Sequence, residues 1–138
     1  MKRFTIRERL FKVDVLFLVD CDRAALTNYL KKVWGINQPV SDWTLGTMLT
    51  YDLPPYRVVW ISNGKNLGIV VHELMHLVLK ICLDRGVPTA PNAGEHTNDD
   101  ETVAYMMEFF LTEYLRRAKG AHRSIQGASK KVPRKPRI

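Results

Sequence analysis

Runs of apolar residues with an extended pattern predict three strands. Residues 4–19 are rich in Val, Phe, Leu and Ile. From 13 to 19, apolar residues fill every second position and most positions between, which predicts a strand covered on both faces. Two more strands are predicted at 43–51 and 56–61, each bounded by polar or proline-containing segments.

Apolar residues at helical spacing predict three helices, over 22–34, 66–84 and 98–117. The first begins at an aspartate cap and ends at Gly35. The second follows a turn at Gly64 and is apolar almost all round, so we expect it to be buried. The third has an apolar side formed by Val103, Ala104, Met107, Phe110, Leu111, Tyr114 and Leu115.

These elements predict a single α+β domain. A small mixed sheet of about three strands is expected to pack against an N-terminal helix, the 66–84 helix and a C-terminal helix. With 138 residues, 46% of them apolar, the chain is long enough for one modest core. We place the domain at 1–119 and a basic tail containing Gly, Ser and Pro at 120–138.

The 66–84 helix contains the motif His72-Glu73-Leu74-Met75-His76, which has the form H-E-x-x-H. Residues i and i+4 share a helix face, so His72 and His76 are placed to bind one Zn²⁺. Glu73 lies beside them and is the candidate general base toward a water molecule. Unpaired polar groups are costly on a buried helix. A bound metal would give the polar residues of this motif a partner.

A catalytic zinc site uses three protein ligands, and Glu101 is the first candidate for the third. It opens the 98–117 helix, which could return antiparallel to the motif helix. The same residue also fits a capping box with Asn98. Glu108, two turns later, and His96, in the preceding loop, are the alternatives.

Tyr105 lies one turn beyond Glu101 and is the candidate donor of a hydrogen bond to an oxyanion. The plainer interpretation is a half-buried aromatic residue. Lys80 is expected at the rim of the site, with its ammonium group reaching solvent.

The net charge of +7 is unevenly distributed. Nine basic residues and no acidic residue fall in 116–138, which leaves twelve basic and fourteen acidic residues in 1–115. We therefore assign the basic character to a tail and not to a face of the domain. Such a tail is either a solvated terminus or an arm that contacts nucleic acid or an acidic protein surface. It lacks interleaved aromatic residues, so nucleic-acid contact by the tail would be blind to sequence.

The two cysteines, Cys21 and Cys82, are not in a C-x-x-C pair and are predicted to be core thiols. No apolar run reaches the roughly 18–20 residues of a membrane span. The first residues lack the apolar segment of a signal peptide. We expect a cytoplasmic protein without membrane contact.

The motif at 72–76 together with Glu101 on a second helix resembles the zincin metallopeptidases, and more narrowly the glutamate-zincins. The order strand, helix, two strands, motif helix, ligand helix is similar to a minimal zincin core over about residues 10–117. His-Glu-Leu-Met-His followed by Asp-Glu-Thr-Val-Ala-Tyr is similar to small metallopeptidases encoded by bacteriophages and prophages. It is more distantly similar to those that cleave phage and mobile-element repressors.

The resemblance implies one zinc held by His72, His76 and Glu101, with Glu73 as the catalytic base. Two features depart from the wider group. Tyr105 stands where an Asp often follows the ligand Glu by four residues, and the third His of the metzincins is absent.

From these features we expect a zinc metallopeptidase that cleaves a peptide or protein in a bacterial host cell. We also expect the strand at 56–61 to be a sheet edge that pairs with extended substrate. The alternative is a phage structural or assembly protein, associated with the virion, that keeps a zincin fold. Its zinc would be structural or vestigial, and its basic tail would bind a phage or host partner or nucleic acid.

Overall fold

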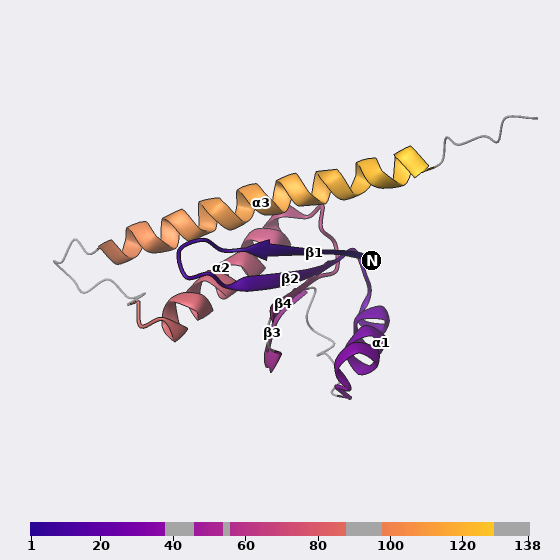
Figure 1. Ribbon diagram of the computed structural model, residues 1–138, viewed down its shortest axis with the longest axis horizontal. Helices are drawn as coiled ribbons and strands as arrows, with labels where there is room; N and C mark the ends of the chain where they lie inside the picture. Colours follow the sequence, from indigo (N-terminus) through magenta and orange to yellow (C-terminus); the bar gives the residue numbers. More distant parts are fainter. Residues whose placement is uncertain (38–45, 54–55, 88–97, 129–138) are drawn as a thin grey trace, which may run out of the picture.

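The computed structural model describes residues 1–37, 46–53, 56–87 and 98–128, and Figure 1 traces their path. Four strands and three helices follow one another in a mixed order. Their bounds are β1 Lys2–Arg7, β2 Asp14–Val19, α1 Arg23–Trp34, β3 Gly46–Leu53, β4 Tyr56–Ile61, α2 Leu67–Asp84 and α3 Asn98–Ala128.

The strands form one mixed sheet in the order β1-β2-β4-β3. β1 pairs antiparallel with β2, β2 pairs parallel with β4, and β3 pairs antiparallel with β4. The predicted α+β class is confirmed, whereas the predicted number of about three strands is one too few. The extra strand arises because the 4–19 stretch, read as one extended run, is a hairpin of β1 and β2.

β4 lies inside the sheet, between β2 and β3. The expectation that the 56–61 strand is a sheet edge is therefore wrong. β3 occupies that edge, because it folds back antiparallel and pairs with β4 from Gly46 opposite Ile61 to Leu53 opposite Tyr56. Of the strands that the structure describes, β3 and β1 are the two at the edges of the sheet.

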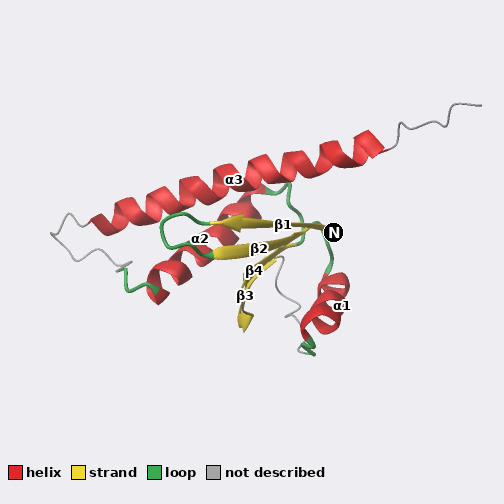
Figure 2. Cartoon of the chain, in the orientation of Figure 1, coloured by secondary structure: helices red, strands yellow, loops and turns green. Residues whose placement is uncertain are grey.

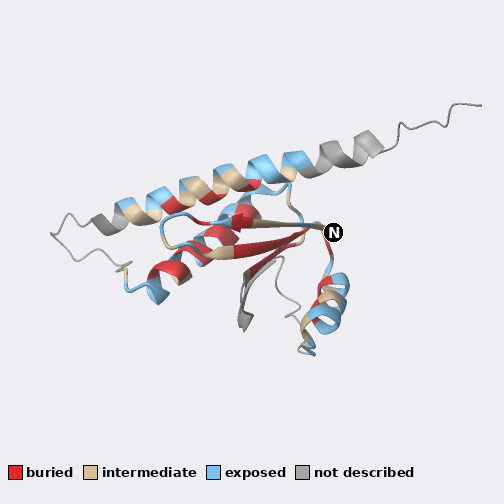
Figure 3. Ribbon diagram, in the orientation of Figure 1, coloured by how far each residue is buried: buried red, intermediate tan, exposed pale blue. Residues whose placement is uncertain are grey.

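β2 contributes side chains to two apolar layers, as its pattern predicts. Val15, Phe17 and Val19 belong to the larger core cluster, beneath α2 and α3. Leu16 and Leu18 belong to the smaller cluster, which α1 covers. Figure 2 shows α1 set apart from α2 and α3, and Figure 3 shows the buried residues in red along β2. The sheet is therefore covered by helices on both faces.

α1 has the predicted bounds because its two ends carry the expected caps. The Asp22 carboxylate accepts the backbone N–H of Ala25 at 2.7 Å, and Gly35 takes the left-handed conformation with φ of 68°. Leu26 and Leu30 are buried, as predicted. Val33 is exposed instead, so the apolar side of this helix is narrower than the spacing suggests.

α3 completes the larger core with Met106, Phe110 and Tyr114, all fully buried. The helix continues to Ala128, past the predicted end at 117 and past the predicted start of the tail at 120. Residues 120–128 are thus helical, and 129–138 lie outside the described residues. Among the described helices, none has the length and apolar character needed to cross a membrane.

Candidate metal centre

The two imidazoles of the motif lie side by side on α2, as the spacing predicts. His72 Nε2 and His76 Nε2 are 3.1 Å apart, and their ring planes meet at 83°. Both residues are exposed. Asn66 holds the beginning of the helix, since its side chain accepts the backbone N–H groups of Gly68 and Ile69.

This separation fits two ligands of one zinc ion. Two nitrogens at about 2.0–2.1 Å from a tetrahedral zinc are roughly 3.3 Å apart, close to the 3.1 Å between His72 Nε2 and His76 Nε2. Neutral imidazole is also a common zinc donor. The pair therefore supplies two of the three protein ligands that a catalytic site requires.

Glu73, the candidate base, is buried on the neighbouring side of the helix, with 5% of its surface exposed. It is one of two buried charged residues among those that the structure describes, the other being Glu8. A carboxylate is costly to bury unless polar groups compensate it. Its position beside the imidazoles and out of bulk solvent suits a group that exchanges a proton with a substrate.

α2 is not buried all round, and this corrects the expectation from its composition. An exposed stripe at four-residue spacing runs along the helix, consisting of Leu67, Val71, Met75, Leu79 and Leu83. Only the opposite side, including Val70, Leu74 and Val78, reaches zero exposure against the sheet and α3. His72 and His76 therefore face outward, and burial alone does not require that a metal compensate them.

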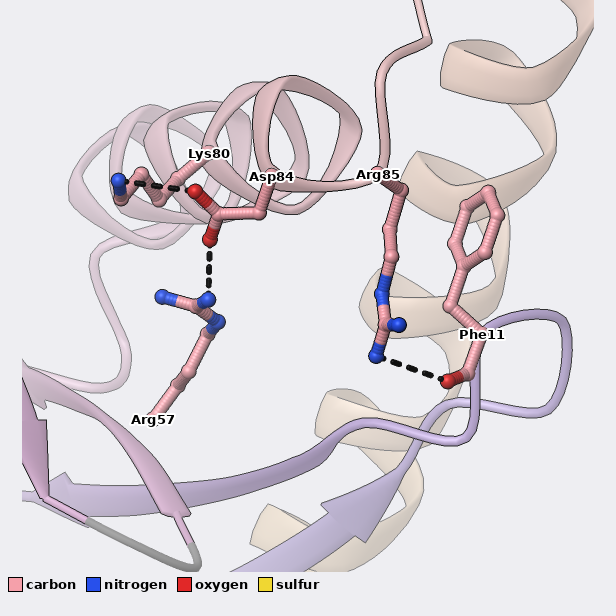
Figure 4. A network of polar contacts seen from close by, with 5 residues as sticks. All are labelled: Phe11, Arg57, Lys80, Asp84 and Arg85. Carbon is pink, nitrogen blue, oxygen red and sulfur yellow. Dashed lines mark hydrogen bonds and ion pairs between the residues drawn. The ribbon is translucent and has the colours of Figure 1, made fainter.

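Lys80 pairs with the end of its own helix (Figure 4). Its Nζ lies 3.0 Å from Asp84, and Arg57 of β4 binds the other oxygen of the same carboxylate. Arg85 donates to the backbone oxygen of Phe11 in the loop between β1 and β2, at 3.4 Å. These contacts connect the C-terminal end of α2 to the sheet. Lys80 therefore pairs with Asp84, whereas the sequence predicts that its ammonium group reaches solvent at the rim of the metal site.

The described part of the chain does not bring Glu101 to the imidazole pair. Cys82 Sγ lies 3.9 Å from Met106 Sδ, and Tyr114 Oη donates to the Gly64 oxygen at 3.2 Å, so α2 and α3 run antiparallel. His76 and Glu101 then lie on opposite sides of the Cys82–Met106 contact, roughly 16 Å apart along the helix axes at about 1.5 Å per residue.

The structure places the other predicted site residues on the exposed surface of α3, or they fall outside the described chain. Glu101, Tyr105 and Glu108 are exposed on α3. Tyr105 stacks on Phe109, with ring centroids 6.5 Å apart. His96 lies outside the described residues. Among the described residues, no group of three His, Cys, Asp or Glu side chains is positioned to hold a metal ion, and the third ligand stays a prediction.

Both cysteines are free and buried, as predicted. Burial raises the pKa of the Cys82 thiol, mainly through desolvation, and the same effect raises the pKa of Cys21. A neutral thiol is a poor zinc ligand and a poor nucleophile, so these two residues act as core packing.

Comparisons with protein-family models, with curated proteins and with solved structures find no match to this chain. The functional argument therefore rests on the residues and their geometry.

Proposed function

We propose that this protein is a zinc-dependent peptidase of the zincin type, with His72 and His76 as metal ligands and Glu73 as the general base. The observation that carries the proposal is the pair of outward-facing imidazole nitrogens 3.1 Å apart. Together with the intervening Glu73, they form the H-E-x-x-H helix on which this chemistry depends.

The arrangement of elements supports the same proposal. β2, α1, β3, β4, α2 and α3 follow in the order expected of a minimal zincin core. α2 packs against both β3 and β4. The imidazole pair therefore belongs to a helix that contacts an edge strand, which is where a peptide could bind.

Each motif residue has a distinct task in this proposal. Zinc, when bound, supplies a Lewis acid that polarises the scissile carbonyl and makes water more acidic. His72 and His76 hold the ion. Glu73 accepts the proton of the attacking water and delivers it to the leaving amine. Glu101, Glu108 and His96 are the candidates for the third ligand.

Substrate is proposed to pair with β3, an edge strand of the described sheet, in place of the 56–61 strand expected from the sequence. Backbone hydrogen bonds supply the affinity in this binding mode. A proline placed within the paired segment of a cleaved peptide removes one donor and should abolish cleavage. Unchanged cleavage of the proline-containing peptide would contradict pairing at β3.

The decisive experiment measures the zinc content of the wild type and of Glu73→Gln, and tests both on a broad peptide library. We expect one zinc per chain in each protein and cleavage by the wild type alone, with a loss of about 10²–10⁴-fold in the variant. Met75→Ala, on the exposed side of the same helix, is the control and should keep both zinc and cleavage. Absence of zinc from wild type grown and purified with zinc would overturn the proposal.

The third ligand is assigned by comparing zinc affinity in Glu101→Gln, Glu108→Gln and His96→Ala. The ligand is the residue whose removal weakens zinc binding roughly 100-fold or more. Loss of a residue that only hydrogen-bonds to a ligand already costs about 10–100-fold, and loss of a ligand should cost at least as much. The two other variants should keep wild-type affinity.

The second candidate function is a structural or assembly protein that keeps this fold. It is favoured by one observation, the distance between Glu101 and the imidazole pair along the antiparallel helices. A structural zinc has no need of a general base. Equal zinc content in wild type and Glu73→Gln, with cleavage of no peptide by either, would favour this candidate.

A further inference from the structure

A second polar site lies between the β1–β2 hairpin and α3, away from the imidazole pair. It is a hollow of about 530 Å³ lined by Arg7, Arg9, Lys12, Phe109, Glu113, Arg116 and Arg117. Five of these seven side chains are basic and one is acidic. We call this hollow the basic pocket. Its composition corrects the assignment of positive charge to the tail, because three of the five cations come from the first strand and the hairpin loop.

The hairpin loop holds its cations in a defined shape. The Glu8 carboxylate is fully buried and accepts the backbone N–H of Phe11 at 2.6 Å, and the Glu8 N–H donates to the Val13 oxygen at 2.8 Å. Lys12 has a φ of 57°, in the left-handed region that non-glycine residues seldom occupy. The loop is thus fixed by its own hydrogen bonds, and its strained tip carries a cation into the pocket.

α3 supplies the opposite wall. Arg116 donates to Glu113 at 2.6 Å, and Arg117 Nε lies 3.9 Å from the same carboxylate. The hydrogen bond from Arg116 lowers the pKa of Glu113, so this group stays ionised and holds the two guanidinium groups together. One carboxylate shared by two guanidinium groups leaves excess positive charge in the pocket.

The cations remain open to a ligand. The Arg116 side chain is 62% exposed, and that of Arg7 is 61% exposed although it pairs with Asp14 at 2.9 Å. Arg9 and Lys12 are also exposed. Exposed guanidinium groups can exchange such surface partners for a phosphate at little cost, because exposed ion pairs are weak.

An aromatic surface adjoins these cations. Phe109 lines the pocket, and its ring stacks on Tyr105 at an interplanar angle of 22°. Tyr105 is 47% exposed, so the stack extends from the pocket wall at Phe109 to an exposed aromatic ring. Cations beside an exposed aromatic ring match the two parts of a single strand of nucleic acid, the phosphates and the unstacked bases. An acidic peptide would use the cations but has no base to stack.

We propose that the basic pocket binds single-stranded nucleic acid, with phosphates on the arginines and a base on the Tyr105–Phe109 stack. The inference is independent of the proposed peptidase, since it uses none of the residues assigned to zinc or to proton transfer at 72–76. It gives Tyr105 a task that differs from the oxyanion contact expected from the sequence.

The test measures binding of a fluorescent oligo-deoxythymidine strand to the full chain by anisotropy, at several salt concentrations. Arg9→Gln combined with Arg116→Gln should weaken binding at least tenfold. It should also reduce the slope of log affinity against log salt by about 0.7 for each phosphate that the protein no longer neutralises. The matched control removes two exposed cations from the last turn of α1, Lys31→Gln with Lys32→Gln, and should change affinity less than twofold.

Tyr105→Ala separates base stacking from charge. We expect affinity to fall roughly fivefold or more with little change in salt slope, because stacking on an aromatic ring is not ionic. Polyglutamate is the competitor that represents an acidic protein. Full affinity of Tyr105→Ala, together with displacement of the oligonucleotide by polyglutamate at equal charge, would overturn the proposal in favour of an acidic peptide.

The tail requires its own variant, because it too is basic. Lys130→Gln with Lys131→Gln and Arg134→Gln, made in the full chain, should leave most of the affinity in place. If this variant loses binding while the Arg9 and Arg116 variant keeps it, the pocket is not the site. An equal fall in affinity in the α1 control pair would likewise overturn the proposal, because binding would then follow net charge alone.

Discussion

The imidazole pair and the basic pocket are built in different ways. His72 and His76 are one turn apart on a single helix, so the backbone geometry of α2 alone sets their 3.1 Å separation. The cations of the pocket come from the N-terminal hairpin and from α3, and they meet only when α3 packs on the sheet. A local site should survive a disturbance of tertiary packing that dismantles a site made of distant segments.

One contact near the beginning of α2 affects the packing of α3, on which the basic pocket depends, but not the backbone geometry that positions the imidazole pair. Gly64 stands against Val19 and Tyr114, and a Cβ at this position would lie 2.6 Å from the Tyr114 hydroxyl. The Tyr114 hydroxyl donates to the Gly64 oxygen. The seating of α3 therefore depends on a glycine outside both sites.

Removing a metal ligand should have the largest effect and should leave the pocket intact. His72→Ala or His76→Ala is expected to weaken zinc binding roughly 100-fold or more, since removal of even an outer-shell partner costs 10–100-fold. Oligonucleotide binding should stay at the wild-type level. Equilibrium dialysis with zinc and the anisotropy assay provide the two measurements.

Met75→Ala is the control for this comparison, because Met75 lies on the same exposed side of α2. It should keep wild-type zinc affinity. Wild-type affinity in both histidine variants as well would mean that the pair is not a metal site.

Gly64→Ala should have the next largest effect, and it should weaken oligonucleotide binding more than zinc binding. Forcing a methyl group against Val19 and Tyr114 is expected to destabilise the protein by about 1–3 kcal/mol or more. Because α3 shifts or detaches, oligonucleotide binding should fall. The two imidazoles, which α2 alone positions, should still bind zinc, and that binding weakens only if the third ligand is Glu101 or Glu108 of α3. Urea unfolding and both binding assays test this.

Gly120→Ala is the matched substitution, since a Cβ there meets no atom within 4 Å. Gly120 lies within α3, so alanine should stabilise the helix by about 1 kcal/mol or less. If the two alanine variants have equal stability, the close contact at Gly64 does not control the docking of α3.

Tyr114→Phe should have the smallest effect, and its sign should depend on pH. Burial raises the pKa of Tyr114 to about 12 from the ordinary value of 10.0. The unfolded chain therefore ionises first, so the wild type loses stability as pH rises from about 10 toward 12, on the order of 2 kcal/mol. The phenylalanine variant cannot ionise, and it lacks a hydrogen bond of roughly 1 kcal/mol.

The wild type should thus be the more stable of the two at pH 8, and the variant the more stable near pH 12. Urea midpoints of both proteins across this range check the crossing. The lysines and other tyrosines titrate in both proteins and cancel in the difference. A stability difference that does not change with pH would show that the Tyr114 hydroxyl is not buried in solution.

Local signals in the sequence predicted the helices and the imidazole pair well. Asp22 and Gly35 bound α1 as expected, and the four-residue spacing placed His72 beside His76. These features depend on contacts within a few residues. The predicted end of the last helix at 117 is too early. Gly120 is a residue type typical of helix ends, but α3 continues through it to Ala128.

Features that depend on distant contacts were not predicted. The turn between β1 and β2 has no Gly, Pro or Asn to mark it and depends on the buried Glu8 carboxylate, so the local pattern predicts one extended run in place of the hairpin. The interior position of β4 is set by which strands pair, and local periodicity carries no such information. The basic pocket joins Arg9 to Arg116, so charge counted along the chain assigned the two residues to different regions.

The final part of the core has a consequence for the order in which the protein is made. Met106, Phe110 and Tyr114 are fully buried against α2 and the sheet, yet the ribosome synthesises them after both. Until α3 emerges, Val70, Leu74 and Cys82 lack part of the apolar surface that covers them. The nascent chain should thus expose this surface to chaperones, and its fold should close when α3 leaves the exit tunnel.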